Sequence, residues 1–143
     1  RDKIDEIMEQ VKCPVAVFVN RQYREGSTVS FVLGGMIDLF LFSYLDKMLQ
    51  NGHSVRLFLF DTDDEEFCGR IDDLQVRYPE QTMIVWFAGV EDLVTKEKDG
   101  LLIMSHLSYT KLSEDEAVMR ELSSLLVIRR NKNTGDKNEG LEN

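Results

Sequence analysis

Short apolar runs and longer segments with helical spacing alternate along this chain. The short runs are rich in Val, Ile, Leu and Phe, residues that favour extended backbone, and each is only five or six residues long. This combination of composition and length predicts β-strands. The predicted strands are residues 15–19, 28–33, 55–60, 82–87, 101–105 and 124–129.

The longer segments between these runs indicate helices. Residues 36–50 contain no helix breaker and are apolar on every side, which is typical of a well-buried helix. Two segments, Thr62 to Glu65 and Ser113 to Glu116, have the spacing of a capping box, in which the first hydroxyl caps the helix. The predicted helices are residues 1–12, 36–50, 62–78 and 90–98, with a short one opened by Ser113.

Strands that alternate with helices, and that are apolar almost throughout, are typical of a parallel sheet covered on both faces. The sequence therefore predicts an α/β fold, a three-layer α/β/α sandwich with one domain over residues 1–130. Residues 131–143 are polar and show no apolar periodicity, so we expect a disordered tail there.

Charge and cysteine content narrow the function classes. The 143 residues carry a formal net charge of −9, which disfavours binding to nucleic acid. Cys13 and Cys68 stand far apart with no histidine cluster, so no metal site is expected. No apolar run approaches the ~18 residues that a membrane span needs. The chain begins with Arg1 rather than Met, and we expect it to be a piece of a longer protein.

The order of these segments resembles the universal stress protein fold, which is of the adenine-nucleotide-hydrolase type. That resemblance implies a mostly parallel five-stranded sheet of order 3-2-1-4-5, formed here by residues 28–33, 55–60, 82–87, 101–105 and 124–129. Residues 1–20 would then be an extra helix and strand from a preceding half-domain. The resemblance places the extra strand 15–19 at the sheet edge, antiparallel to strand 124–129.

A closer resemblance is to the soluble carboxy-terminal tail of cation:proton antiporters. The segments that carry it, in chain order, are Cys13–Arg21, Phe31–Asp38, Leu41–Met48, Gly100–Met104 and Leu125–Arg129. The departure is at residues 36–39, where such tails usually carry a more charged turn. The resemblance implies a non-catalytic regulatory domain at the cytoplasmic face of the membrane. Its partner would be the membrane-embedded part of the same polypeptide. The domain would modulate transport by that part through ligand binding, a response to pH or self-association.

The alternative is a stand-alone universal stress protein that binds a nucleotide. ATP-binding members of that family carry G-x2-G-x9-G-[ST] after the fourth strand, whereas residues 105–113 here contain no glycine. ATP binding in that manner is therefore not expected, and no cofactor is predicted. A small nucleotide and a homodimer remain candidate partners. Because strand 15–19 would occupy the edge beside strand 124–129, we expect a monomer or a dimer through another face.

Ligands of doubly wound sheets bind at the carboxyl ends of the strands, where the strand order reverses. That crevice lies between strands 28–33 and 101–105, and the candidate ligand-binding residues there are Gly34, Gly35, Asp38, Ser105 and His106. The two glycines precede a helix N-terminus, which suits an anion; the alternative is a tight turn that needs glycine. His106 could sense pH, or it could be an ordinary loop histidine.

The acidic run Asp61 to Glu66 has two interpretations. Clustered carboxylates suit a hard cation, but acidic residues also stabilise a helix N-terminus. The capping interpretation is favoured because it accounts for Thr62 and Glu65 as well. No catalytic residue is predicted, since G-x-S-x-G and Walker patterns are absent.

Overall fold

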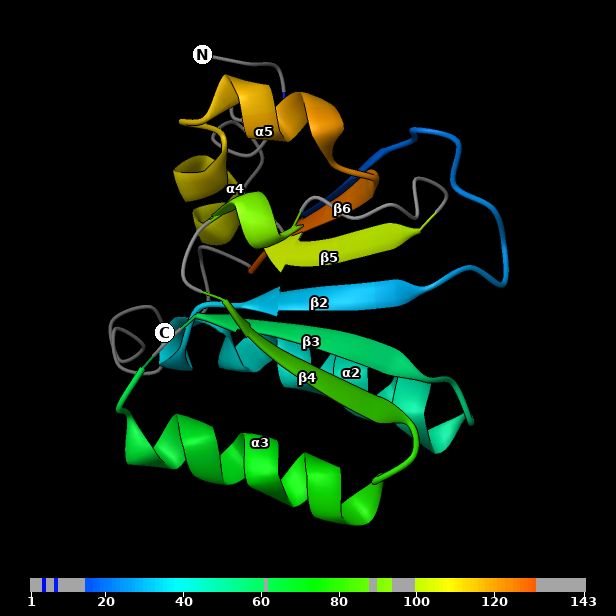
Figure 1. Cartoon of the computed structure of the whole chain (residues 1–143), viewed down its shortest axis with the longest axis vertical. Helices are drawn as coiled ribbons and strands as arrows, with labels where there is room; N and C mark the ends of the chain where they lie inside the picture. Colours follow the sequence, from blue (N-terminus) through cyan, green and yellow to red (C-terminus); the bar gives the residue numbers. More distant parts are fainter. Residues whose placement is uncertain are drawn as a thin grey trace.

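The computed structural model describes residues 15–60, 62–87, 90–93 and 100–130, together with Ile4 and Ile7, which are helical. A six-stranded sheet runs through the molecule with helices on both of its faces (Figure 1). The strands are β1 (Val15–Val19), β2 (Val29–Leu33), β3 (Val55–Phe60), β4 (Thr82–Phe87), β5 (Leu101–Ser105) and β6 (Ser124–Arg129). The expected helix 1–12, apart from those two isoleucines, and the expected tail 131–143 lie outside the described residues.

The strands lie in the order β4-β3-β2-β5-β6-β1. The pairs β2–β3, β3–β4, β2–β5 and β5–β6 are parallel, and β1 alone runs antiparallel, beside β6. Counted in chain order from β2, the five parallel strands stand as 3-2-1-4-5. The α/β class and the mostly parallel sheet predicted from the sequence are therefore confirmed.

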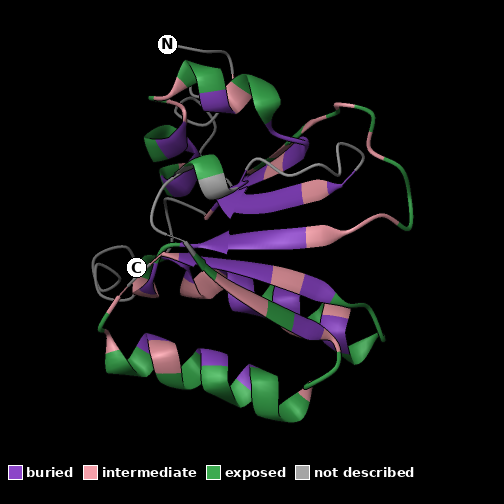
Figure 2. Cartoon of the chain, viewed as in Figure 1, coloured by how far each residue is buried: buried purple, intermediate pink, exposed green. Residues whose placement is uncertain are grey.

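Two separate apolar clusters fill the space between the sheet and its helices. One face of the sheet packs on α2 (Phe42–Gln50) and α3 (Glu65–Arg77). The other face packs on η2 (Val90–Leu93), α4 (His106–Leu112) and α5 (Glu116–Glu121). The central strands are buried along most of their length (Figure 2), as expected of strands that are covered on both sides. Within the described residues, no helix has the length and apolar character to cross a membrane.

The predicted helix 36–50 is in fact two elements. A 3₁₀ segment, η1 (Met36–Leu41), precedes α2, and its first hydrogen bond runs from Asp38 N–H to the Gly35 carbonyl (3.0 Å). The prediction of burial on every side was also wrong, because Ile37 and Tyr44 are 38% and 45% exposed. The tighter first turn carries Asp38 back over the end of β2, a contact that helical periodicity does not reveal.

Both helix starts with a predicted capping box are capped by an aspartate instead. Asp64 accepts hydrogen bonds from the backbone N–H groups of Glu66 and Phe67 at 3.0 and 3.2 Å, and Asp115 accepts one from Val118 at 3.1 Å. Thr62, the predicted cap, accepts a hydrogen bond from Asp64 N–H in the turn before α3. Aspartate is at least as good a cap as threonine or serine, so the sequence pattern alone does not fix which of the neighbouring side chains caps the helix.

Two further differences concern the helices near β5. Ser113, the other predicted cap, instead ends α4, a helix that the sequence did not predict. The predicted helix 90–98 is described only as the 3₁₀ turn η2, because residues 94–99 lie outside the described part.

Strand β1 is held in place by the chain that follows it. It pairs with β6 from Val15↔Arg129 to Val19↔Leu125, which confirms the expected antiparallel neighbour. The Arg21 backbone N–H donates to Ser124 Oγ (2.7 Å), and its guanidinium donates to the carbonyls of Met119 and Leu122 at the end of α5. Arg21 thus satisfies helix carbonyls that have no partner within α5.

Truncation of Phe67 tests the core beneath α3. Its ring is fully buried and meets Phe42 edge-on, with the centroids 6.3 Å apart. Phe67→Ala should lower the free energy of unfolding by about 3–5 kcal/mol, because it leaves a cavity. Val76→Ala, on the same helix at a side chain 79% exposed, should change it by less than about 0.5 kcal/mol. Urea unfolding measures both, and equal effects would contradict the packing.

Candidate functional site

The carboxyl ends of β2 and β5 lie side by side. These strands pair in parallel from Val29↔Leu101 to Phe31↔Ile103, so the residues that follow them share one edge of the sheet. Gly34 and Gly35 follow β2, and His106 begins α4 directly after Ser105, the last residue of β5. The structure thus brings the predicted segments together at the point where the strand order reverses.

Asp38 joins the two segments. Its Oδ2 accepts a hydrogen bond from Gly34 N–H (2.6 Å) and another from the Ser108 hydroxyl (3.3 Å). Ser105 Oγ in turn accepts a hydrogen bond from Ser108 N–H (3.1 Å) and caps α4. Asp38 therefore ties the turn after β2 to the first turn of a helix 70 positions further along the chain.

The Asp38 carboxyl is fully buried and only partly satisfied. Its side chain has no solvent exposure, and no hydrogen-bond partner for Oδ1 occurs within the described residues. Burial raises the pKa of Asp38 because it penalises the charged form. The hydroxyls of Ser105 and Ser108, the Gly34 amide and the positive charge of Lys111 act in the opposite direction but do not cancel it. The group is therefore easier to protonate than an exposed aspartate.

The two glycines have different reasons to be glycine. Gly35 has φ +124°, a conformation that residues with a side chain rarely adopt, and it is the N-cap residue of η1. At Gly34 a Cβ would lie 3.2 Å from Asp38 Oδ2, so a side chain would press on the carboxylate. The amide at which the sequence predicted an external anion holds, in this structure, the chain's own carboxylate.

The remaining predicted residues lie near this carboxyl in different ways. Ser105 stabilises its charged form, whereas the hydrogen bonds that Asp38 receives do not include His106. His106 is half-buried at the first position of α4. Sequence reasoning missed Ser108. The signal available was its position three residues after Ser105, the spacing at which a cap and its helix approach each other.

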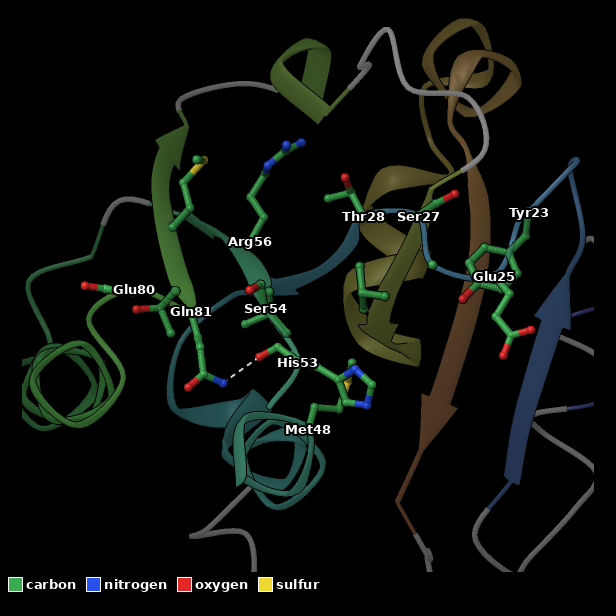
Figure 3. Close-up of a pocket in the computed structure, with 15 residues that line it drawn as sticks. Tyr23, Glu25, Ser27, Thr28, Met48, His53, Ser54, Arg56, Glu80 and Gln81 are labelled. Atoms are coloured by element: carbon green, nitrogen blue, oxygen red, sulfur yellow. Dashed lines mark hydrogen bonds between the residues drawn. The ribbon is translucent and has the colours of Figure 1, made fainter. Parts of the chain in front are cut away.

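A hollow lies at the opposite end of the strands, at the amino ends of β2, β3 and β4 (Figure 3). It has a volume of about 770 Å³, and its polar lining includes Glu25, His53, Arg56 and Glu80. The Gln81 amide closes one side by donating to the Leu49 and His53 carbonyls at 2.9 and 2.7 Å. Charged side chains of both signs line this groove.

Neither place has the donors of a metal centre. Across the described residues, no group of three His, Cys, Asp or Glu side chains converges as metal ligands would. The acidic run before α3 is explained by the Asp64 cap, although Asp61 lies outside the described residues. In comparisons with known proteins, no family model, curated protein or solved structure matches this chain.

The raised pKa of Asp38 predicts how stability depends on pH. The folded state binds this proton more tightly than the unfolded state, whose pKa is about 3.9. The stability that protonation contributes is complete below that value and is lost as pH rises through the folded-state pKa. The asparagine in Asp38→Asn has no proton to lose, so the stability of this variant relative to wild type should increase as pH rises from 4 to 8.

Chemical denaturation at each pH measures this difference. Asp72→Asn, at an exposed carboxyl on α3, is the matched control and should change the free energy of unfolding by less than about 0.5 kcal/mol. If the stability of Asp38→Asn relative to wild type stays constant or falls as pH rises, the buried carboxyl carries its charge without an energetic penalty.

Proposed function

We propose that this chain is a non-catalytic regulatory domain, of the universal stress protein type, at the cytoplasmic face of a monovalent cation:proton antiporter. Two features of the fold support the assignment to that type. The order β4-β3-β2-β5-β6 agrees with the 3-2-1-4-5 order of that fold. Strand β1 lies antiparallel beside β6, where the last strand of a preceding half-domain would pair.

The observation that carries the regulatory function is the buried carboxyl of Asp38. It lies where the two halves of the sheet meet, it contacts both, and burial makes it prone to protonation. A change of its charge alters the hydrogen bonds that hold α4 against the turn after β2. A domain attached to a proton-coupled transporter can respond to the transported proton in this way.

The nucleotide-binding alternative lacks a phosphate cradle. Strand β5 passes into α4 with no loop between them, since Ser105 ends the strand and His106 begins the helix. Residues 105–113 contain no glycine whose backbone could approach a triphosphate. The nearby Gly34 amide is already bound to a carboxylate, which repels phosphate.

Transport by the full-length protein tests this proposal. In everted vesicles from cells that lack their own antiporters, the protein should exchange Na⁺ or K⁺ for protons with a steep dependence on cytosolic pH. Asp38→Asn should flatten that dependence because the carboxyl can no longer titrate, whereas Asp72→Asn should leave it unchanged. Absence of exchange would refute the antiporter assignment. An unchanged profile in Asp38→Asn would refute only the role of this carboxyl.

Calorimetry of the domain with ATP, ADP, AMP and cyclic dinucleotides tests the alternative, a stand-alone protein that binds a nucleotide. We expect no saturable heat and no shift in melting temperature with any of them, because α4 follows β5 directly and offers no glycine loop for phosphates. Saturable binding that Gly34→Ala abolishes would favour the stand-alone nucleotide-binding protein instead.

A further inference from the structure

Strand β4 forms the edge of the sheet opposite β1. The hydrogen bonds between β3 and β4 determine which backbone groups of β4 face β3 and which face outward. Val55 N–H donates to the Gln81 carbonyl (2.7 Å), and β3 pairs with β4 in the parallel register that begins at Val55↔Thr82. A parallel ladder uses alternate residues of each strand. The backbone amides and carbonyls of Met83 and Val85 therefore face β3.

The other set of β4 backbone groups points away from the sheet. These groups belong to Thr82, Ile84 and Trp86, and nothing in the described part of the chain hydrogen-bonds to their amides or carbonyls. A row of free donors and acceptors along an edge is a template for another strand. The outer side of β4 thus presents three residues ready for pairing.

This edge lacks the features that usually prevent pairing. Natural edge strands are protected by charged side chains, proline or bulges, whereas β4 has the sequence TMIVWF and pairs in continuous register with β3. Met83 and Trp86 are 58% and 50% exposed, on opposite faces of the sheet. Figure 2 shows this exposure along β4 beside the buried strand β3.

We propose that β4 pairs antiparallel with β4 of a second copy of this chain, about a two-fold axis at Ile84. In that register Ile84 faces Ile84 of the other copy, and Thr82 faces Trp86. All of the outward-facing residues then lie in pairs that exchange both backbone hydrogen bonds. The result is a continuous sheet through two copies, with helices on both faces of each half.

The chemistry of β4 selects a second copy as its partner. A register shifted by two residues leaves one outward residue unpaired, so the arrangement centred on Ile84 is the most complete. It also sets the large Trp86 beside the small Thr82, and Met83 beside Val85. Each copy carries a net charge of −9, and β4 is a segment without ionisable side chains where two such copies can meet.

The other edge of the sheet is less suited to this role. On β1 the exposed ring of Phe18 already packs edge-on against Tyr23, with the centroids 6.3 Å apart. The loop after β1 supplies Tyr23 for this contact. Trp86 has no such ring contact within the described residues. The inference rests on the fold alone and holds whether or not the domain regulates an antiporter.

Amide hydrogen exchange with residue resolution tests the pairing directly. As protein concentration rises from about 5 µM to about 500 µM, the amides of Ile84 and Trp86 should become protected. Those of Met83 and Val85 should be protected at every concentration, because they face β3 in the monomer. Protection of Ile84 and Trp86 that does not depend on concentration would overturn the proposal.

Sedimentation equilibrium with substituted chains identifies the surface. Wild type should be a dimer at high concentration, and higher salt should strengthen it by screening the like net charges. Trp86→Lys should raise the dimer dissociation constant at least tenfold. Met83→Lys, whose side chain lies on the other face of the sheet, should have an effect of the same size. Leu107→Lys, at an exposed apolar side chain on α4, is the control and should remain dimeric.

Circular dichroism establishes that each substituted chain folds. A wild-type chain that stays monomeric at about 500 µM would overturn the proposal. The same holds if Phe18→Lys dissociates a dimer that Trp86→Lys leaves intact, because the interface would then be the β1 edge.

Discussion

Strand β2 pairs in parallel with β3 on one side and with β5 on the other, and the rest of the structure depends on this double pairing. Parallel strands need crossover connections, which are almost always right-handed. A chain that moves first to one side of β2 and then to the other must therefore cover both faces. Helices α2 and α3 occupy one face, and α4 and α5 occupy the other. The same reversal brings the carboxyl ends of β2 and β5 together, which is where Asp38 lies.

A fully buried carboxyl at this position is costly unless its oxygens are satisfied. Gly34 and Ser108 satisfy Oδ2, whereas Oδ1 has no partner within the described residues. Native structures contain few such groups, and each calls for an explanation. Proton binding supplies one, since the neutral acid carries no charge to desolvate. The regulatory function proposed for this domain depends on proton binding by Asp38. Because Asp38 contacts the turn after β2 and the start of α4, a change in its charge would affect both halves of the sheet.

The two edges of the sheet differ in what they leave open. Strand β1 closes the edge beside β6, and the side chain of Arg21 holds its end against α5. Strand β4 ends the sheet on the other side with free amides and carbonyls and with no charged side chain. Strand β1 is the other terminal strand of the sheet, and β4 is the edge at which we propose that a second copy pairs. The proposed association and the proposed response to protons therefore involve different parts of the molecule.

The amino-acid sequence by itself determined the α/β class and the strands, because strand composition and length are local properties. Five of the six predicted strands have the bounds that the structure shows, and the remaining one begins at Val29 instead of residue 28. The proximity of the turn at Gly34 and the start of α4 also followed from sequence, since parallel strands end at the same side of the sheet. Tertiary structure alone decided the caps at Asp64 and Asp115, the 3₁₀ start of the helix after β2, and the contact between Asp38 and Ser108. These depend on how distant segments meet in space, which the local pattern of apolar and polar residues does not encode.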